Sequence, residues 1–296
     1  LERPRRILMM IKAGQPIDDT IASISPYLEE GDLLIDGGNS LYTDTERRVA
    51  ELESKSFGYI GMGVSGGAKG ALEGPSMMPG GTKASYDAIE SLVTKMAAQV
   101  EDGPCVTYIG PGGSGHFVKT VHNGIEYGIE QILAEAYDLM KRVAGMGGTE
   151  MADVLGKWNS SEELSSYLVE ITEVCLRTKD PEDGSDLVEK IMDQAGQKGT
   201  GLWTVVSALQ MGAPVPTIYA SLNARVMSSL KPQRVAAEAS LKGPAIKAFP
   251  MGTPEDGMAP LMDAVVLASM ASYAQGMELM RIASEEHNYK LHMPSI

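Results

Sequence analysis

The sequence is short of cysteine, of aromatic residues and of long apolar runs, and each shortage excludes a class of protein. Its 2 cysteines, Cys105 and Cys175, lie far apart and lack the spacing of metal ligands, which argues against a disulfide-rich secreted domain. Both are interpreted as buried thiols in a reducing compartment. No run reaches the ~18 apolar residues of a membrane span and no signal-peptide pattern is present, so a cytoplasmic protein without a membrane partner is expected.

A surplus of basic residues is also absent. The chain has 25 Lys and Arg against 39 Asp and Glu, a formal charge of -14, which argues against a nucleic-acid partner. A phosphorylated ligand would need a local cluster of basic side chains. Only 5% of the residues are aromatic whereas 19 are Met, so the packing is expected to be mostly aliphatic and thioether. At 296 residues and 43% hydrophobic content, the chain is long enough for two domains.

The first part of the chain alternates short apolar runs with helical patterns, which indicates βαβ units and a mostly parallel sheet. Strands are predicted over 7–11, 33–36, 59–64 and 105–109, helices over 17–28, 43–55 and 83–98, and a loop over 74–81. Pro26 is expected to shorten or kink the first helix. Thr43 or Asp44 is the expected cap of the second helix.

After residue 115 the pattern becomes helical. Helices are predicted over 116–144, 148–158, 162–178, 185–195, 203–212, 215–230 and 258–285, with a loop over 243–257. The sequence therefore predicts an α/β domain over 1–114 followed by an all-helical domain over 115–296. Active sites often lie near such a junction.

The junction carries a glycine-rich turn with two interpretations. Gly110–Gly115 matches GxGxxG between a predicted strand and a helix, which is typical of a dinucleotide-phosphate site. However, Pro111 is unusual there, and the turn follows the last predicted strand rather than the first. These features favour a hinge between two domains.

The helix after this turn presents four polar side chains on one face. Lys119, His122, Asn123 and Glu126 stand at offsets 0, 3, 4 and 7, within an arc of roughly 100°. A lysine near a reacting carbon can accept a hydroxyl proton, and a carboxylic acid can return a proton to carbon. The alternative is a solvated helix surface with a weak charge pair, but the mixture of side chains favours a catalytic function.

Further candidates are weaker because a structural role explains each of them equally well. Val64–Gly67 and Asp36–Asn39 each lie at the carboxyl end of a predicted strand, where open α/β sheets bind ligands, but either segment can be a simple turn. Lys198 lies in the glycine-rich loop 196–201, and Arg225 fits a buried ion pair as well as an anion ligand. His287 and His292 lack partner spacing and are assigned no role.

Taken together, these motifs resemble the 6-phosphogluconate dehydrogenase family within the β-hydroxyacid dehydrogenases. The spacing from Gly110 through Lys119 to Asn123 resembles the catalytic signature of the β-hydroxyacid dehydrogenases, and His122–Gly128 resembles the phosphogluconate branch. The other segments that carry the resemblance are 35–40, 63–67, 196–201 with Trp203, and 272–276. The resemblance covers essentially the whole chain in the same order.

The resemblance implies a fold and a reaction. The fold is a partial Rossmann-like domain that binds NADP, followed by a helical domain for substrate binding and dimerisation. The reaction is the oxidative decarboxylation of 6-phospho-D-gluconate to D-ribulose 5-phosphate and CO2, in the pentose phosphate pathway, with NADP+ and without a metal. It also implies a homodimer.

The resemblance also implies roles for individual residues. Lys119 is the expected base and Glu126 the expected acid. Substrate ligands are expected at Asn39, Ser65, Gly66, Gly67, His122, Asn123, Tyr127, Lys198 and Arg225, of which Tyr127, Lys198 and Arg225 hold the phosphate. The nicotinamide end of the cofactor is expected to contact Ile11, Lys12, Ala13 and Asn39.

The chain departs from the family pattern in ways that leave alternatives open. The family's cofactor fingerprint precedes the strand with which this chain begins, and its C-terminal tail, which contributes to the phosphate site of the second subunit, follows Ile296. The chain as given is therefore expected to be inactive. Ala68 and Lys69 replace an acidic pair. Another β-hydroxyacid dehydrogenase, of the 3-hydroxyisobutyrate or tartronate semialdehyde type, and a non-catalytic helical dimerisation scaffold are the competing hypotheses.

Overall fold

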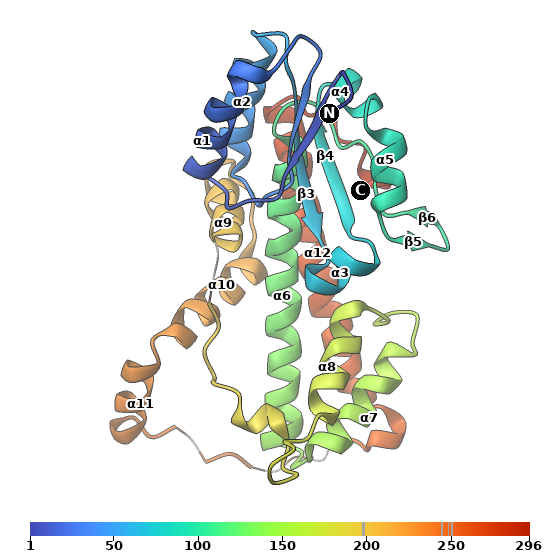
Figure 1. Cartoon of the computed structure of the whole chain (residues 1–296). Coiled ribbons are helices and arrows are strands. Elements are labelled where there is room, and N and C mark those ends of the chain that lie inside the picture. Colours follow the sequence, from blue (N-terminus) through green and yellow to red (C-terminus); the bar gives the residue numbers. More distant parts are fainter. Residues whose placement is uncertain (197–198, 244, 248, 250) are drawn as a thin grey trace. The chain divides into compact units, whose positions relative to one another are not determined.

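The computed structural model describes every residue except 197–198, 244, 248 and 250. Its contacts define two compact units. Unit 1 comprises Leu1–Gly124, Gly199–Pro214 and Gly276–Ile296, and unit 2 comprises Ile125–Lys198 and Val215–Gln275. Two long helices, α6 (Ser114–Arg142) and α12 (Ala259–Glu286), contribute residues to both units (Figure 1). The predicted boundary at 114/115 stays a prediction.

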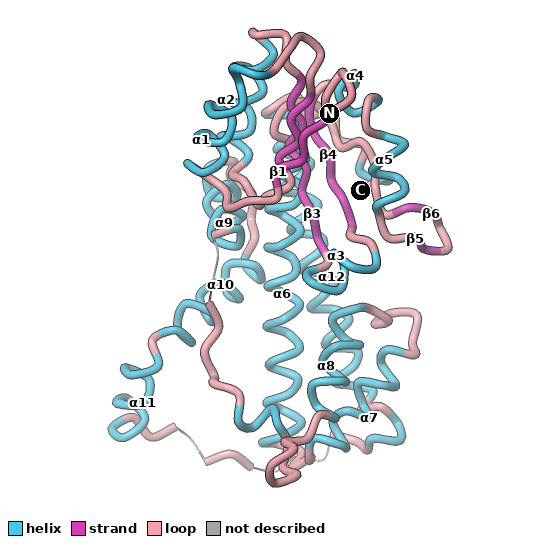
Figure 2. The backbone as a smooth tube through the Cα atoms, in the orientation of Figure 1, coloured by secondary structure: helices cyan, strands magenta, loops and turns pink. Residues whose placement is uncertain are grey.

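The centre of unit 1 is a four-stranded sheet in the order β1 (Arg6–Met9), β2 (Leu33–Asp36), β3 (Gly58–Ser65), β4 (Ser76–Gly81) (Figure 2). The first three strands are parallel and β4 is antiparallel to β3, so the predicted mostly parallel sheet is confirmed. The loop predicted over 74–81 is wrong, because β4 occupies most of it.

The strand predicted over 105–109 is also wrong. That segment forms only isolated bridges, Met77 with Val106 and Gly80 with Gly110. A short hairpin, β5 (Gln99–Val100) with β6 (Gly103–Pro104), precedes it.

Helices cover both faces of this sheet because successive strand residues point to opposite sides. Leu34 packs in a cluster with Ile17 of α1 (Gln15–Ile24) and Leu52 of α2 (Tyr42–Glu53). Its neighbours Leu33 and Ile35 belong to a second cluster on the other face. That cluster includes residues of the short helices α4 (Lys83–Asp87) and α5 (Glu90–Met96). The predicted Rossmann-like α/β layering is therefore confirmed.

Local boundaries in unit 1 differ from the prediction at three places. The first helix ends at Ile24 and Pro26 lies in a 3-10 turn, Ser25–Tyr27, so the expected shortening is confirmed. The expected cap at Thr43 or Asp44 is wrong, because α2 already begins at Tyr42 and no side chain caps it. The predicted helix over 83–98 divides into α4 and α5. The remaining helices of unit 1 are α3 (Gly67–Glu73) and α9 (Thr200–Gln210), with a 3-10 turn at Met293–Ser295.

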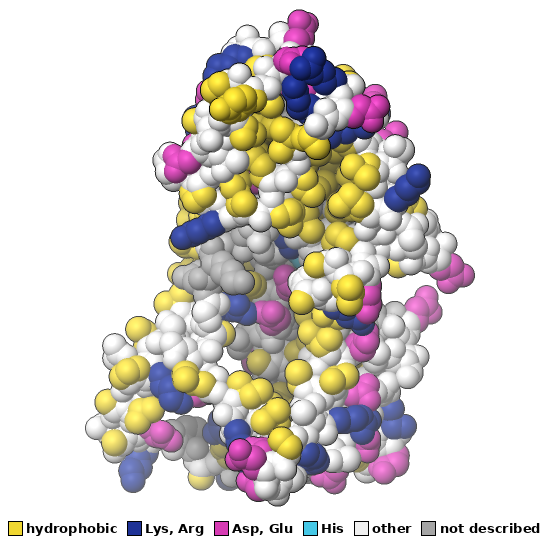
Figure 3. Space-filling view, viewed as in Figure 1, with side chains coloured by type: hydrophobic (Ala, Val, Ile, Leu, Met, Phe, Trp, Pro, Cys, Tyr) yellow, Lys and Arg dark blue, Asp and Glu magenta, His cyan; other side chains and the backbone are white. Residues whose placement is uncertain are grey.

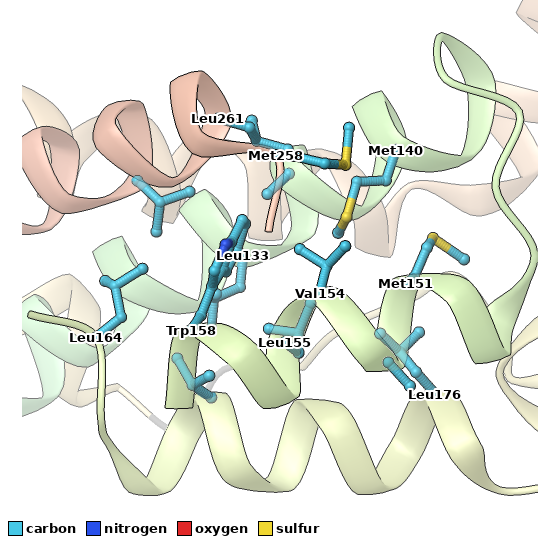
Figure 4. Packing of buried hydrophobic residues seen from close by; sticks show 14 residues of the cluster. Leu133, Met140, Met151, Val154, Leu155, Trp158, Leu164, Leu176, Met258 and Leu261 are labelled. Carbon is cyan, nitrogen blue, oxygen red and sulfur yellow. The ribbon is translucent and has the colours of Figure 1, made fainter. Parts of the chain in front are cut away.

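Unit 2 is helical, as predicted. Besides its parts of α6 and α12, it contains α7 (Gly148–Asn159), α8 (Tyr167–Arg177), α10 (Pro216–Ser229) and α11 (Lys231–Ser240), with a 3-10 turn at Pro254–Asp256. Figure 4 shows the apolar side chains of α7 directed at those of Met140, Met258 and Leu261. Trp158 is fully buried among them, and its indole Nε1 donates to the carbonyl of Gly257 at 2.9 Å.

The helix predicted over 185–195 is wrong, and α11 was not predicted. Only Leu187–Lys190 forms a 3-10 turn in that region. The chain there is held by ion pairs, Lys179 with Asp186 and Lys190 with Asp180, which compete with a regular helix. The interpretation of both cysteines as buried is also wrong, because Cys175 is exposed and Cys105 only half-buried.

Candidate active site

The first turns of α6 lie directly against the backbone of β3 and β4. A Cβ at Gly115 would stand 2.2 Å from the carbonyl oxygen of Met78 and 2.4 Å from that of Gly61. A Cβ at Gly63 would stand 2.4 Å from the Cβ of Lys119. Only glycine permits these approaches. They place Lys119 beside the carboxyl half of β3, where open α/β sheets bind ligands.

The same packing bears on the glycine-rich turn before α6. Gly113 and Gly115 are buried, and a Cβ at Gly113 would stand 2.5 Å from the carbonyl oxygen of Tyr42. Both glycines therefore face protein backbone rather than an open surface. This arrangement argues against the dinucleotide-phosphate interpretation of the turn, whereas its function as a hinge stays a prediction.

Four predicted residues, Lys119 among them, form one cluster of contacts. Lys119 Nζ donates to Asn123 Oδ1 at 2.7 Å, and only 5% of the residue is exposed. His122 Nδ1 lies 3.1 Å from the same oxygen, and an amide oxygen only accepts, so His122 donates from Nδ1. Its Nε2 then accepts, and Ser65 Oγ lies 3.4 Å away at the end of β3. The carboxamide thus contacts a lysine and an imidazole, and the imidazole in turn lies beside a hydroxyl.

Thr200, which the sequence did not indicate, completes this cluster. Asn123 Nδ2 donates to Thr200 Oγ1 at 2.9 Å, and Thr200 is the first residue of α9. One turn later, Thr204 Oγ1 donates to the carbonyl of Thr120 at 2.7 Å. A Cβ at Gly124 would stand 2.5 Å from Thr204 Cγ2, so α9 lies closely against α6. The sequence predicted a loop over 196–201 and a helix only from residue 203, so no pattern placed Thr200 in a helix beside Asn123.

The loop with Asn39 is held by a buried carboxylate. Asp36 is fully buried, and its oxygens accept from Gly38 N at 3.0 Å, Ser40 Oγ at 2.6 Å and Tyr59 OH at 3.0 Å. Burial and the charge of Asp36 raise the pKa of Tyr59. These bonds fix the turn after β2, and Asn39 itself is exposed.

The residues expected to hold the nicotinamide lie beside that turn. Met10 is 59% exposed and Ile11 is 39% exposed at the carboxyl end of β1, followed by the exposed Lys12 and the half-buried Ala13. A Cβ at Gly38 would stand 2.9 Å from the carbonyl oxygen of Ile11, so the two loops abut. Figure 3 shows hydrophobic side chains gathered over this part of unit 1. An exposed apolar surface beside a carboxamide fits a flat ring that carries an amide.

Two of the residues expected around a phosphate, Tyr127 and Arg225, lie in unit 2. The Arg225 guanidinium carbon stands 3.8 Å from the centre of the Tyr127 ring, and its Nη1 donates to the carbonyl of Gly196 at 3.1 Å. Its Nη2 pairs with the carboxylate of Glu130. Burial raises the pKa of Glu130, and Arg225 opposes that shift. The ion pair of Arg225 is therefore confirmed, although it is half-buried rather than buried, and its use as an anion ligand stays a prediction. Lys198 lies outside the described residues.

The sequence did not indicate the ion pair of Arg225 with Glu130.

Glu126, the expected acid, is half-buried on α6 two turns after Lys119. The exposed Gly66 and Gly67 follow Ser65 at the start of α3 with left-handed φ angles of 137° and 57°.

Among the residues that the structure describes, no cluster of His, Cys, Asp and Glu has the arrangement of a metal site, and no helix is long and apolar enough to cross a membrane.

Two family models match almost the whole chain. Residues 1–110 match the NAD binding domain of 6-phosphogluconate dehydrogenase, and residues 115–296 match the C-terminal domain of the same enzyme. A decarboxylating 6-phosphogluconate dehydrogenase of Synechocystis is 56% identical over 299 residues, which cover 100% of this chain and 62% of that relative. The enzyme of Escherichia coli K12 is 51% identical, covering 100% of this chain and 63% of its own length.

The solved structures agree with these relatives. The 6-phosphogluconate dehydrogenase of Plasmodium falciparum, described with its cofactor NADP+ and its substrate 6-phosphogluconate, has a TM-score of 0.93 at 43% identity, over 100% of this chain and 63% of its own. A 3-hydroxyisobutyrate dehydrogenase of Mycobacterium tuberculosis has a TM-score of 0.55 at 18% identity, over 79% of this chain and 74% of its own, which shows the fold alone. The chain spans about 62% of the length of the curated relatives it matches.

Proposed function

Because this chain belongs to the 6-phosphogluconate dehydrogenase family, we propose that the full-length protein converts 6-phospho-D-gluconate to D-ribulose 5-phosphate and CO2 with NADP+. The observation that carries the proposal is the hydrogen bond from the buried Lys119 to Asn123, with His122 and Ser65 beside it. The arrangement holds an amine where a hydroxyl proton can be removed and surrounds it with polar groups for a sugar acid.

Lys119 and Glu126 divide the proton transfers. In its neutral form, the Lys119 amine takes the proton of the C3 hydroxyl while hydride leaves C3, giving a 3-keto acid. The resulting ammonium then donates a hydrogen bond to the new carbonyl oxygen, which accepts electron density as the bond to the carboxylate breaks and CO2 leaves. Glu126 then protonates C1 of the resulting enediolate, which gives the ketone. NADP+, when bound, supplies the hydride acceptor, and Ile11, Lys12, Ala13 and Asn39 hold its nicotinamide end.

The remaining residues hold the substrate. Ser65, with the backbone N–H groups of Gly66 and Gly67, holds the carboxylate, since left-handed glycines can present adjacent N–H groups to an anion. His122, Asn123 and Asn39 hold the hydroxyls. Tyr127, Lys198 and Arg225 hold the phosphate. Lys198 and Arg225 supply the local basic cluster that a phosphorylated ligand needs on an acidic chain.

The organisation of the whole protein belongs to the same proposal. Residues 1–114 form part of an NADP-binding domain, and 115–296 form part of a helical domain for substrate binding and dimerisation. The full-length protein acts as a homodimer in the cytoplasm.

The deciding experiment measures NADP+ reduction with 6-phosphogluconate by the full-length protein and its Lys119→Met variant. We expect kcat to fall by about 10²–10⁴-fold, the usual contribution of a general base. Lys55→Met is the control, because Lys55 is half exposed and pairs with Glu51 near the end of α2. A wild type without turnover would favour the scaffold hypothesis. A loss below about tenfold would contradict the role of Lys119.

A second variant separates the phosphosugar enzyme from other β-hydroxyacid dehydrogenases. Arg225→Ala is expected to raise KM for 6-phosphogluconate by at least about tenfold, because a charge-assisted hydrogen bond to phosphate contributes roughly 1.5–3 kcal/mol. Arg281→Ala, an exposed arginine that pairs with Glu278 and Glu285, is the control. An unchanged KM in Arg225→Ala would remove the support for a phosphorylated substrate.

A further inference from the structure

The side chain of His116 is buried one helical turn before Lys119 and has no part in the reaction proposed above. It is 1% exposed, and its Nδ1 lies 2.7 Å from the hydroxyl oxygen of Thr45, which is fully buried at the start of α2. A Cβ at Gly61 of β3 would stand 2.5 Å from Thr45 Cγ2 and 2.8 Å from His116 Nδ1. The ring and the hydroxyl therefore meet over the backbone of β3 and join α6 to α2.

This hydrogen bond holds the end of the turn that carries Asn39. The beginning of the turn is held by the buried carboxylate of Asp36, which accepts from the backbone and a hydroxyl within the turn. The end of the turn leads into α2, and Leu41, which precedes α2, has no side chain that can accept a hydrogen bond. The bond between Thr45 and His116 therefore fixes the point at which the turn enters the helix.

The ring of His116 is neutral and lies on the same side of the sheet as Asp36. Asp36 is the register partner of Gly61, so both residues direct their side-chain positions to the face that His116 covers. Burial lowers the pKa of His116, whereas the charge of Asp36 and the backbone of Gly38 raise it. A neutral imidazole here is a rigid hydrogen-bonding group, so it fixes geometry rather than charge.

We propose that His116 is a positioning residue for the cofactor: through Thr45 it fixes the Asn39 turn relative to Lys119 and so aligns the nicotinamide with the substrate carbon. This inference rests on the proposed dehydrogenase function. His116 and Lys119 are three residues apart on α6, so the base and the turn share one anchor. His116 and Thr45 act through the turn and take no part in proton transfer.

Binding of the cofactor gives the first test. Thr45→Val removes the hydroxyl with little change of shape, and Thr45→Ser keeps it. Calorimetry on the full-length protein compares NADP+ with adenosine 2′,5′-bisphosphate, a fragment that lacks the nicotinamide. Thr45→Val is expected to raise the Kd for NADP+ about fivefold, the effect of one typical hydrogen bond, and to leave the Kd for the fragment within about twofold of wild type. Thr45→Ser is expected to restore binding of NADP+.

The hydride transfer step gives the second test. His116→Leu is expected to lower kcat by about tenfold, because small misplacements of reacting groups cost up to about 10²-fold. KM for 6-phosphogluconate is expected to stay within about twofold of wild type. The deuterium isotope effect on kcat, with substrate deuterated at C3, is expected to rise, since hydride transfer becomes more rate-limiting. His116→Asn, whose amide can place a polar atom near the Nδ1 position, is expected to recover most of kcat.

A double variant tests whether the two residues act through one bond. Residues that share an interaction show non-additive effects, so Thr45→Val is expected to add almost nothing to the kinetic loss of His116→Leu. Thr172→Val is the matched control, since the Thr172 hydroxyl donates to the carbonyl of Leu168 in its own helix, at 2.6 Å. Its kinetics and its binding of NADP+ are expected to equal those of wild type.

Each other outcome contradicts a specific statement. Equal weakening of NADP+ and of the fragment in Thr45→Val would reveal a general effect on unit 1 and overturn the positioning role. Unchanged binding and kinetics in Thr45→Val would also overturn it, whether or not His116→Leu folds, while leaving the proposed function intact. A wild type that does not reduce NADP+ with 6-phosphogluconate would instead contradict the proposed function itself.

Discussion

The two units of this chain bury different kinds of side chain. In unit 1, Asp36 and Arg48 are 0% and 1% exposed, and the Asp36 carboxylate accepts from Tyr59, Ser40 and Gly38. In unit 2, the main cluster consists of apolar side chains around Trp158. One of the two cores is therefore partly polar and directional, and the other is almost wholly apolar.

The polar network of unit 1 and the apolar cluster of unit 2 contribute to the structure in different ways. A buried polar network stabilises a structure only when its donors and acceptors are matched, which restricts it to few arrangements. In unit 1 that network fixes the turn that carries Asn39. An apolar cluster tolerates repacking more readily and needs no such matching. The apolar cluster of unit 2 thus contributes stability through area and volume, whereas the polar network of unit 1 holds one loop of the candidate site.

The largest effect is expected from Gly115→Ala, which tests the closeness of the backbone packing in unit 1. The added Cβ would stand 2.2 Å from the Met78 carbonyl and 2.4 Å from the Gly61 carbonyl, and neither backbone atom can move aside easily. We expect the free energy of unfolding to fall by about 3 kcal/mol or more. Native-state hydrogen exchange of unit 1 in the full-length protein measures it. Gly243→Ala, where a Cβ meets open space, is the control, and equal effects would contradict the packing argument.

The second prediction breaks the polar network at Arg48. Its Nε and Nη2 donate to Asp18 at 2.8 and 3.0 Å, and its Nη1 lies 3.6 Å from Asp36. Arg48→Met removes the cation beside the fully buried Asp36 carboxylate and one of the two arginines that hold Asp18, so we expect a loss of about 3 kcal/mol in the free energy of unfolding.

Arg47 offers the matched control for this variant. It is 50% exposed and donates to the same carboxylate of Asp18 at 2.9 Å. Arg47→Met is expected to cost less than about 1 kcal/mol, because exposed ion pairs contribute little. Urea unfolding of the full-length protein, with exchange to assign the loss to unit 1, measures both. Equal losses would show that burial of Arg48 does not matter.

Features with a strong local period could be predicted from the sequence. The alternation of apolar runs and helical patterns indicated the layered unit 1, and the offsets of Lys119, His122 and Asn123 indicated their common helix face. These predictions succeeded because the periods of a strand and of a helix belong to the sequence itself.

Features that depend on tertiary contact could not be predicted. The Pro79–Gly81 segment has poor strand propensity, yet it forms part of β4. It lies between β3, with which it pairs, and the backbone of α6 at Gly115. Thr200 and Glu130 entered the candidate sites through contacts spanning 77 and 95 residues of sequence. A local sequence pattern cannot indicate a contact between residues so far apart in the chain.

The third prediction tests the apolar core of unit 2 at Trp158. Trp158→Phe keeps an aromatic ring but removes the bond to the Gly257 carbonyl and leaves a small cavity. We expect a loss of about 2 kcal/mol, of which about half comes from the unpaired carbonyl. Thermal unfolding and exchange in α7 measure it. The loss is expected to stay constant across pH, since no titratable group takes part, and a pH-dependent loss would contradict the apolar interpretation.

The smallest effect is expected from Asp18→Asn, which compares the two units by the pH dependence of the free energy of unfolding. Hydrogen bonds from Arg48, and then from Arg47, lower the pKa of Asp18 in unit 1 from 3.8 to about 2. A carboxylate with a lowered pKa stabilises the fold above its unfolded pKa and loses that contribution as pH falls through the folded pKa. Asp18→Asn is therefore expected to cost about 1 kcal/mol at neutral pH, after allowance for solvent screening, and almost nothing near pH 2.

Asp183 in unit 2 is the control for this pH dependence. Lys190 lowers its pKa to about 2 as well, but the Asp183 side chain is 55% exposed and the pair lies at the surface. Asp183→Asn is expected to change the free energy of unfolding less than Asp18→Asn at every pH, because water screens the pair. Urea unfolding of both variants between pH 2 and pH 7 measures the difference. Equal pH dependence would mean that the polar contacts of unit 1 gain nothing from their burial.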